Sequence, residues 1–557
     1  MSTALALALA LLGVSVILPP EIEPAGRIAA GVLAAAAIAI GAFRTRIVPR
    51  PWWLLLPPAI AAIVAADGGR ARVVDEAAAL VGFAAIVCLG RRLARDRRAA
   101  LLLPQMLALA GGLAAAQAIA QHHWAYPQQA AALRAAADPA ADPYLVRLEA
   151  GRPSGPFSLP AALAGFLALT IPSTLAALRG AAGRRGVRAG GLALLLLQMD
   201  ALWLTRSIGG ALALAVSLGC LLVPESRKPR LALAVAVSLA AMIAILFAIE
   251  RRAEIGAYAG SDPVSLRLGN WRAAMTMIGD HPLTGVGPGR FGVFYPRYLR
   301  PGMNETIHAH NTFLEIAACW GVWTLPVLAW LAARVLKRLP RTPGAAPAPE
   351  GGLFRRAALA AGTGFLAHNL IDFTFYLPGV ALPAALLRGA GTGEPEEGSE
   401  ARTRAPDARA LAAAVCGIGL ALAVGAHAVV AGRVAGLLDK AQDAARAGKI
   451  EAAEVMAGRA AGLRRGDPDP WAFVAQSIAA NPAVGTEDAD ARRARGMAAA
   501  LRAARLEPES AILHYTAALH LRAAGDEAGA VIETERALRL FPSKPLYRAA
   551  APAEAPR

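Results

Sequence analysis

The chain has 557 residues, of which 56% are hydrophobic and only 17% are charged. Soluble globular proteins normally carry about 25% charged residues, so the composition excludes an ordinary soluble protein and indicates a polytopic membrane protein with some soluble mass attached. The formal net charge of +17 does not require a nucleic-acid partner, because the arginines cluster in short loops between apolar segments, where they act as topology signals. The basic excess adds only attraction to anionic lipid headgroups.

Apolar segments of membrane-spanning length recur through residues 1–431. A spanning helix needs about 20 mostly apolar residues, and this length rule predicts an all-α membrane domain with about 12–13 spans. The candidate spans are residues 3–19, 27–42, 52–66, 76–90, 100–120, 157–178, 189–204, 208–223, 231–249, 311–336, 353–371, 376–389 and 409–431. The first has no basic segment before it and no clear cleavage site after it, so we interpret it as a span rather than a signal peptide.

Arginine and lysine residues are concentrated in alternate loops between these segments. The basic loops are residues 43–51, 91–99, 179–188, 224–230 and 337–352. Cytoplasmic loops carry such an excess, and all five loops fall on one side of the arrangement together with the N-terminus. The sequence therefore predicts a cytoplasmic N-terminus. The polar loops 121–156 and 250–310 and the C-terminus are expected on the opposite side of the membrane.

Residues 432–557 have the composition and periodicity of a soluble helical domain. Leu506 and Leu540 are 34 residues apart, as are Pro508 and Pro542, and 34 is the period of tetratricopeptide repeats. Helices are expected over residues 434–447, 451–464, 510–523 and 526–540. Such repeats stack into a scaffold that usually contacts a protein or peptide partner, and the alternative is a helical cap that binds nothing.

No metal or cofactor site is predicted. The four cysteines, Cys88, Cys220, Cys319 and Cys416, stand singly in apolar segments, so neither a zinc site nor a disulfide framework is indicated. The outer loops contain no D-x-D or H-E-x-x-H motif, and the glycines at 285–292 are spaced for a tight loop rather than for a nucleotide.

The stretch from Arg267 to Gly321 is polar and lies between long apolar segments. It carries arginines, including Arg267 and Arg290, and His308 and His310 stand toward its end. Cationic groups and histidines held beside a bilayer indicate an anionic, membrane-bound substrate.

Four motifs in and before this stretch resemble the O-antigen ligase and O-antigen polymerase superfamily. In chain order they are Arg152 opening R-P-S-G-P-F, Arg267 in R-x-x-x-W with Trp271, P-L-T-G-V-G at residues 282–287, and His310-Asn311 followed after nine residues by Gly321. The resemblance covers residues 150–375. The chain departs from the family pattern at Ala161, where an Asn often follows the proline, and at Thr324, where a second glycine is common.

The resemblance implies a GT-C-like glycosyltransferase in the bacterial inner membrane. It implies transfer of a glycan from undecaprenyl diphosphate to an acceptor at the periplasmic face without a metal ion. We favour O-antigen ligase activity, with lipid A–core as the acceptor. A polysaccharide polymerase and a protein O-oligosaccharyltransferase share the signature, and the C-terminal repeats favour the latter or the recruitment of a protein partner. A polysaccharide transporter and a membrane scaffold are the alternatives from other classes.

The expected chemistry assigns roles to individual residues. Guanidinium groups bind phosphate oxygens bidentately and keep their charge, so the arginines are expected to hold the diphosphate, although an arginine at a membrane boundary is also commonly an interfacial anchor. Imidazole titrates near neutral pH, so His310 is the predicted catalytic base. The predicted substrate-binding residues are Arg152, Arg206, Arg267, Arg290, His308, His368 and Asp372.

Neighbouring polar residues have structural alternatives. Asn311 is expected to cap the helix that follows it. Glu315 needs a partner within the apolar helix, for which an arginine is the simplest choice. His368 and Asp372, four residues apart, would share a helix face, where they orient His310 or an arginine, line the sugar path, or form only a local pair that closes the turn.

Overall fold

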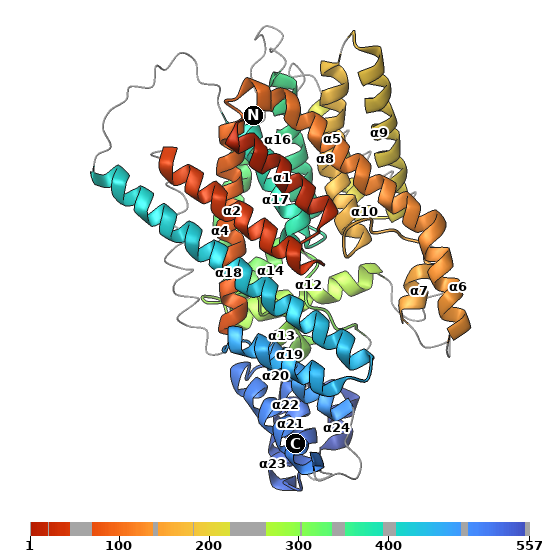
Figure 1. Cartoon of the computed structure of the whole chain (residues 1–557), viewed down its shortest axis with the longest axis vertical. Coiled ribbons are helices and arrows are strands. Elements are labelled where there is room, and N and C mark those ends of the chain that lie inside the picture. Colours follow the sequence, from red (N-terminus) through yellow and green to blue (C-terminus); the bar gives the residue numbers. More distant parts are fainter. Residues whose placement is uncertain are drawn as a thin grey trace. The chain divides into compact units, whose positions relative to one another are not determined.

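The structure is a computed structural model. It describes residues 2–20, 22–44, 69–136, 143–181, 183–222, 263–300, 303–336, 351–393, 408–480 and 488–551. Within these ranges the ordered elements are helices and no strand occurs (Figure 1), which confirms the predicted all-α class. The candidate spans at residues 52–66 and 231–249 lie outside the described residues.

The chain divides into two compact units. Unit 1 comprises Met1–Val48, Leu80–Ala259 and Pro326–Ala428, and unit 2 comprises Pro49–Ala79, Gly260–Leu325 and Val429–Arg557. Unit 2 therefore joins three segments that are far apart in the sequence. The division at residue 428 falls close to the predicted domain boundary at 431, but the polar segment 260–325 groups with the C-terminal helices rather than with the apolar ones.

Unit 1 is built from apolar helices around α8. Its helices are α1 (Thr3–Ile17), α2 (Pro24–Arg44), α4 (Arg70–Leu93, which begins in unit 2), α5 (Arg97–Ala120), the π-helical turn η2 (Gln121–Ala125), α6 (Tyr126–Ala136), α7 (Pro143–Glu149), α8 (Pro160–Gly180), α9 (Arg185–Thr205), α10 (Ile208–Leu222), α15 (Thr324–Leu336, which begins in unit 2), α16 (Gly351–His368), η5 (Thr374–Tyr376), α17 (Pro378–Thr392) and α18 (Ala408–Arg446, which ends in unit 2). Helix α8 packs against α5, α9, α10 and α16 and is the most buried of the candidate spans.

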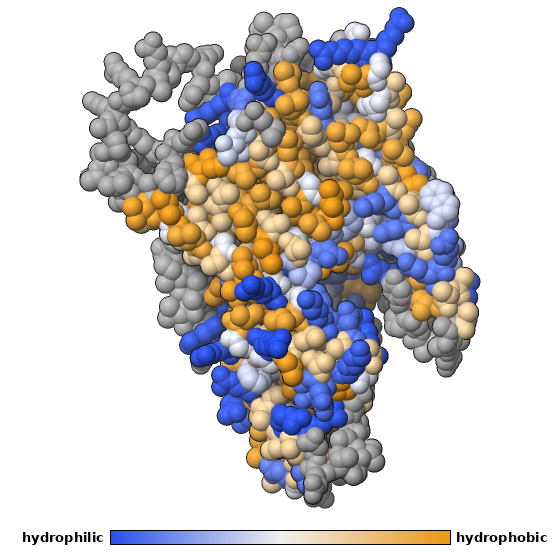
Figure 2. All heavy atoms as spheres, viewed as in Figure 1, coloured by the Kyte–Doolittle hydropathy of each residue, from blue (hydrophilic) through white to orange (hydrophobic). Residues whose placement is uncertain are grey.

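The outer helices of unit 1 expose apolar side chains. Only 17% of the most apolar stretch of α9 is buried inside the structure. Its side chains Leu196 and Trp203 are 61% and 48% exposed. Figure 2 shows apolar residues over much of the visible surface of this unit's helices. Exposed apolar surface of this extent needs lipid around it, so the protein is a polytopic α-helical membrane protein.

Five helices in the described ranges are long and apolar enough to cross a membrane. They are Arg70–Leu93, Leu101–Ala135, Pro160–Gly180, Arg185–Thr205 and Val415–Arg446, with shorter apolar helices at Thr3–Ile17, Pro24–Ile40 and Ile208–Leu221. Two predicted features differ from the structure. The span expected over 311–336 is two helices separated at Gly321, and the loop expected from residue 121 continues α5 through η2 into α6.

Unit 2 combines the polar segment with a stack of C-terminal helices. Its elements are α12 (Pro263–Asp280), α13 (Phe291–Phe294), η4 (Tyr295–Tyr298), α14 (Thr312–Trp320), α19 (Ile450–Leu463), α20 (Asp469–Ala480), α21 (Asp488–Leu506), α22 (Ala511–Ala523), α23 (Glu527–Leu540) and α24 (Pro545–Ala550). From α19 onward each helix packs against the next one in the chain. The expected α22–α23 hairpin turns at Gly525, where φ is 83°, and Asp526 caps α23. The tetratricopeptide assignment itself stays a prediction.

Candidate functional site

His310 lies in a strained turn directly before α14. Its φ is 52°, in the left-handed region that costs a residue with a Cβ about 1–2 kcal/mol. Asn311 follows in extended conformation, and its side-chain oxygen accepts hydrogen bonds from the N–H groups of the first turn of α14, which confirms it as the N-cap. The indole N–H of Trp271, on α12, donates to the His310 carbonyl at 3.2 Å. The turn is therefore fixed from both sides.

The other end of α14 is bound by the segment 282–287. The N–H groups of Val286 and Gly287 donate to the carbonyls of Ala318 and Cys319 at 2.9 and 3.0 Å. These two carbonyls belong to the last turn of α14, which has no partners for them within the helix. The loop thus completes the hydrogen bonding of the helix that His310 precedes.

Two motif glycines make this contact possible. A Cβ at Gly285 would lie 2.3 Å from the carbonyl carbon of Cys319, and a Cβ at Gly321 would lie 2.2 Å from the carbonyl oxygen of Leu283. Both glycines also have positive φ, 63° and 99°. Gly285 is therefore required by the backbone at the end of α14, and Gly321 is required by the backbone of the segment 282–287. This gives a physical reason why the two motifs occur together.

Glu315 is buried in the first turns of α14. Its carboxylate accepts the N–H of Ala309 at 2.9 Å and contacts Nδ1 of His308 at 2.7 Å. The partner of this acidic group is thus a histidine and a backbone amide. His308 is one of the predicted substrate-binding residues, and the contact holds its ring against the turn that leads to His310.

Arg267 lies one helical turn before Trp271 on α12. Residues four apart share a helix face, so Arg267 stands on the face of α12 whose Trp271 reaches the His310 carbonyl. Through this contact, unit 2 brings the Arg267–Trp271 face of α12 to the turn that carries His308 and His310, although Trp271 and His310 are 39 residues apart in the sequence.

Arg152 contacts the residue directly before Arg206 in unit 1. The Nε of Arg152 donates to the carbonyl of Thr205 at 2.9 Å, and Arg206 is the next residue, at the C-cap of α9. The φ of Arg206 is 48°, and in the described part of the chain only Arg206 and His310 combine a side chain with a positive φ. Such strain collects at functional sites, where the surroundings hold it in place.

His368 and Asp372 also belong to unit 1. The ring of His368 is completely buried, its Nδ1 lies 3.0 Å from Oγ1 of Thr374, and it packs against Gly165 and Gly209, where any Cβ would lie 3.0 Å or less from the ring. The carboxylate of Asp372 accepts the N–H of Phe373 at 2.9 Å. These contacts fix the turn after α16, and the substrate-binding role of both residues stays a prediction.

The comparison with protein families bears on this geometry. The family model for O-antigen ligase matches residues 192–329, a range that runs from α9 through Arg206, α12, the segment 282–287 and His310 into α15. This match supports the O-antigen ligase superfamily, and residues 192–329 are called the ligase domain below. Searches of curated proteins and of solved structures give no match. The motifs of the ligase domain around Arg267 and His310 lie within the match, whereas Arg152, His368 and Asp372 lie outside it.

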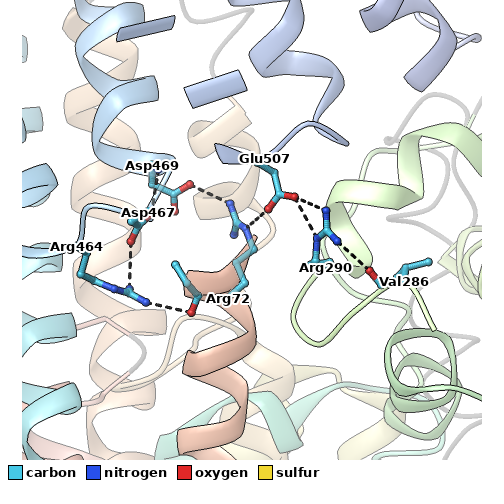
Figure 3. A network of polar contacts seen from close by, with 8 residues as sticks. Arg72, Val286, Arg290, Arg464, Asp467, Asp469 and Glu507 are labelled. Atoms are coloured by element: carbon cyan, nitrogen blue, oxygen red, sulfur yellow. Dashed lines mark hydrogen bonds and ion pairs between the residues drawn. The ribbon is translucent and has the colours of Figure 1, made fainter. Parts of the chain in front are cut away.

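Arg290, also in the ligase domain, is bound by the C-terminal helices (Figure 3). Its Nη2 and Nε lie 2.6 and 3.1 Å from Oε1 of Glu507, and its Nη1 donates to the carbonyl of Val286 at 3.4 Å. Arg290 is 4% exposed and Glu507 is fully buried. Arg72 of α4 lies between this carboxylate and a second one. Its Nε is 3.5 Å from Oε2 of Glu507, and its Nη2 is 2.9 Å from Oδ1 of Asp469. The Arg290 guanidinium orders the loop beside α14, and its role in substrate binding stays a prediction.

Sequence reasoning missed Glu507. The signal is visible in the repeat, because R-L-E-P at 505–508 corresponds to R-L-F-P at 539–542. Phe541 is buried, so its counterpart Glu507 is a charged residue at a position where the repeat buries an apolar one. Such a residue needs a cationic partner.

The described residues contain no group of three or more His, Cys, Asp or Glu side chains that could hold a metal ion. Transfer without a metal ion stays a prediction.

Proposed function

We propose that this protein is a glycosyltransferase that moves a glycan from undecaprenyl diphosphate to an acceptor hydroxyl at the periplasmic face, with His310 as the general base. The observation that carries the proposal is the turn at His310. Its left-handed backbone is held by Trp271 on one side and by the Asn311 cap on the other, at the junction of three motifs of the ligase domain. Strain held in this way is typical of a residue placed for chemistry.

The reaction assigns one task to the histidine and another to the arginines. His310 accepts the proton of the acceptor hydroxyl, and the resulting oxygen attacks C1 of the donor sugar. The bond from C1 to the diphosphate breaks, and undecaprenyl diphosphate leaves with the electron pair. Guanidinium groups stabilise the charge on this leaving group, and we assign that task to Arg267 and, from the sequence analysis, to Arg152 and Arg206.

Lipid A–core is the acceptor that we favour. A growing glycan or a protein would make the same chemistry a polymerase or a protein O-oligosaccharyltransferase reaction. The identity of the acceptor therefore distinguishes these activities, while the roles of His310 and Arg267 are common to all of them.

The test compares wild type with His310→Ala and His310→Gly, all purified in lipid and free of divalent metal. The donor is an undecaprenyl diphosphate glycan, and lipid A–core, excess donor and a periplasmic protein mixture are supplied separately. Wild type is expected to modify one acceptor. Both variants are expected to lose 10²-fold or more in rate, the range for a general base. His310→Gly is expected to unfold about 1 kcal/mol less easily than His310→Ala, because glycine tolerates the positive φ.

The control is His123→Ala, which replaces an exposed histidine of the η2 turn and should keep the wild-type rate. If both His310 variants transfer glycan at the wild-type rate, His310 is excluded as the base. A wild type that binds the donor and modifies no acceptor would exclude the transferase itself.

A further inference from the structure

A polar cavity lies in unit 2, between α12 on one side and η4 with Arg300 and Met303 on the other. Its volume is about 210 Å³. Its polar and flexible lining residues are Arg272, Thr276, Tyr295, Tyr298, Arg300 and Met303. Pockets for drug-sized ligands usually measure about 300–1,000 Å³, so this cavity has room for one small polar group rather than for a long chain.

The cavity lies on a different face of α12 from the His310 turn. Gly269, Arg272, Ala273 and Thr276 line it and repeat every three or four residues, as one helix face does. At about 100° per residue, Thr276 stands about 180° around the helix from Arg267. One helix thus carries the Arg267–Trp271 face toward His310 and the cavity on its opposite side.

The arginines of the polar segment fall into two groups. Arg290 and Arg297 form ion pairs with Glu507 and Glu509 at the start of the α21–α22 turn. Arg272 and Arg300 are exposed, and no acidic side chain among the described residues pairs with either. Both of these unpaired guanidinium groups belong to the cavity lining, so its positive charge is available to a ligand.

The two tyrosines give the cavity a fixed, uncharged wall. The hydroxyl of Tyr295 donates to Oδ1 of Asn270 at 2.6 Å, and burial raises the pKa of Tyr295 to about 12. Burial and the nearby carboxylate of Asp280 raise the pKa of Tyr298 to about 12 as well. Both rings therefore stay neutral at physiological pH, and they do not offset the charge of the arginines.

We infer that this cavity binds one acidic sugar unit of the glycan, whose carboxylate or phosphate pairs with Arg272 and Arg300 while its ring lies against Tyr295 and Tyr298. The inference rests on the proposed glycan transfer and adds a substrate class to it. Guanidinium groups recognise planar oxyanions bidentately, and aromatic walls with few convergent polar groups are the usual lining of small-ligand pockets. The cavity would select glycans that contain an acidic residue.

Saturation-transfer NMR on the full-length protein in detergent micelles tests the inference. Glucuronic acid, glucose and inorganic phosphate serve as probes. Glucuronic acid is expected to bind, with a Kd at least tenfold lower than that of glucose or phosphate. The double change Arg272→Gln/Arg300→Gln should raise this Kd at least tenfold. Thr276→Phe, which narrows the cavity without changing its charge, should also weaken binding, and Arg539→Gln, at an exposed arginine of α23, should not.

Two results would overturn the inference. Equal binding of glucuronic acid by wild type and the double variant would place the ligand elsewhere. Phosphate or glucose binding as tight as that of glucuronic acid would show a site for any small anion or any sugar. His310→Ala, which should lose transfer, is expected to bind glucuronic acid normally. Binding that follows the arginines while wild type transfers no glycan would leave the cavity standing and remove the proposed transferase.

Discussion

At the residue scale, the described site depends on backbone conformations that few residues adopt. His310 and Arg206 have positive φ despite their side chains, and Gly285 and Gly321 have positive φ at points where backbone lies against backbone. The sequence motifs contain His310 and both glycines, but they do not show why glycine is needed at residues 285 and 321. It depends on distances between segments that only the folded chain brings together.

Gly321→Ala is expected to destabilise unit 2 by about 2 kcal/mol or more, because the added Cβ meets the carbonyl of Leu283 and the positive φ disfavours alanine. Thermal unfolding in detergent measures the change. The matched control is Gly279→Ala, near the end of α12, where a Cβ meets nothing within 4 Å and a small gain in stability is expected. Equal unfolding temperatures for the two variants would contradict the close backbone contact between the segment 282–287 and the end of α14.

At the element scale, α14 is capped by the residue before it and is held at both ends by contacts from other segments. Asn311 and Trp271 fix its start, and segment 282–287 binds its last turn. The N-cap was predictable because Asn is a strong capping residue. The break between α14 and α15 could not be predicted from the sequence, because residues 311–336 form one largely apolar run. The helices are separated at Gly321, where the backbone contacts Leu283 of another segment.

Glu507→Gln is expected to cost about 3–5 kcal/mol of stability, because it leaves the buried guanidinium of Arg290 without its counter-charge. The control Glu509→Gln removes the partner of Arg297 in a partly exposed pair and should cost about 1 kcal/mol or less. Denaturant unfolding compares them. The double change Arg290→Met/Glu507→Met should recover most of the loss, and a Glu507→Gln protein as stable as wild type would refute the role of the pair.

At the scale of the whole molecule, composition and the periodicity of apolar segments predicted the membrane class and most helices. They did not predict that residues 260–325 share a unit with the C-terminal helices. That grouping depends on single contacts such as Arg290–Glu507, which composition does not encode. The orientation across the membrane still rests on the basic loops and is open to a direct test.

Cysteine labelling measures this orientation. The four native cysteines are first replaced by serine. Glu527→Cys then places an exposed thiol on the predicted periplasmic side, and Arg185→Cys places one on the predicted cytoplasmic side. In intact spheroplasts a membrane-impermeant maleimide is expected to label Glu527→Cys and to reach Arg185→Cys only after permeabilisation, because the basic loop 179–188 is predicted to be cytoplasmic. The opposite pattern would invert the predicted topology.

The Arg290–Glu507 pair also constrains how this protein can have evolved. The two residues are 217 positions apart, and a change in either alone leaves the other buried with an unbalanced charge. Gene fusion or exchange of the C-terminal helices would therefore succeed only when the incoming tail supplies a carboxylate at this turn. Across relatives, we expect the positions of Arg290 and Glu507 to change together. Relatives that lack the C-terminal helices are expected to have another residue in place of the arginine.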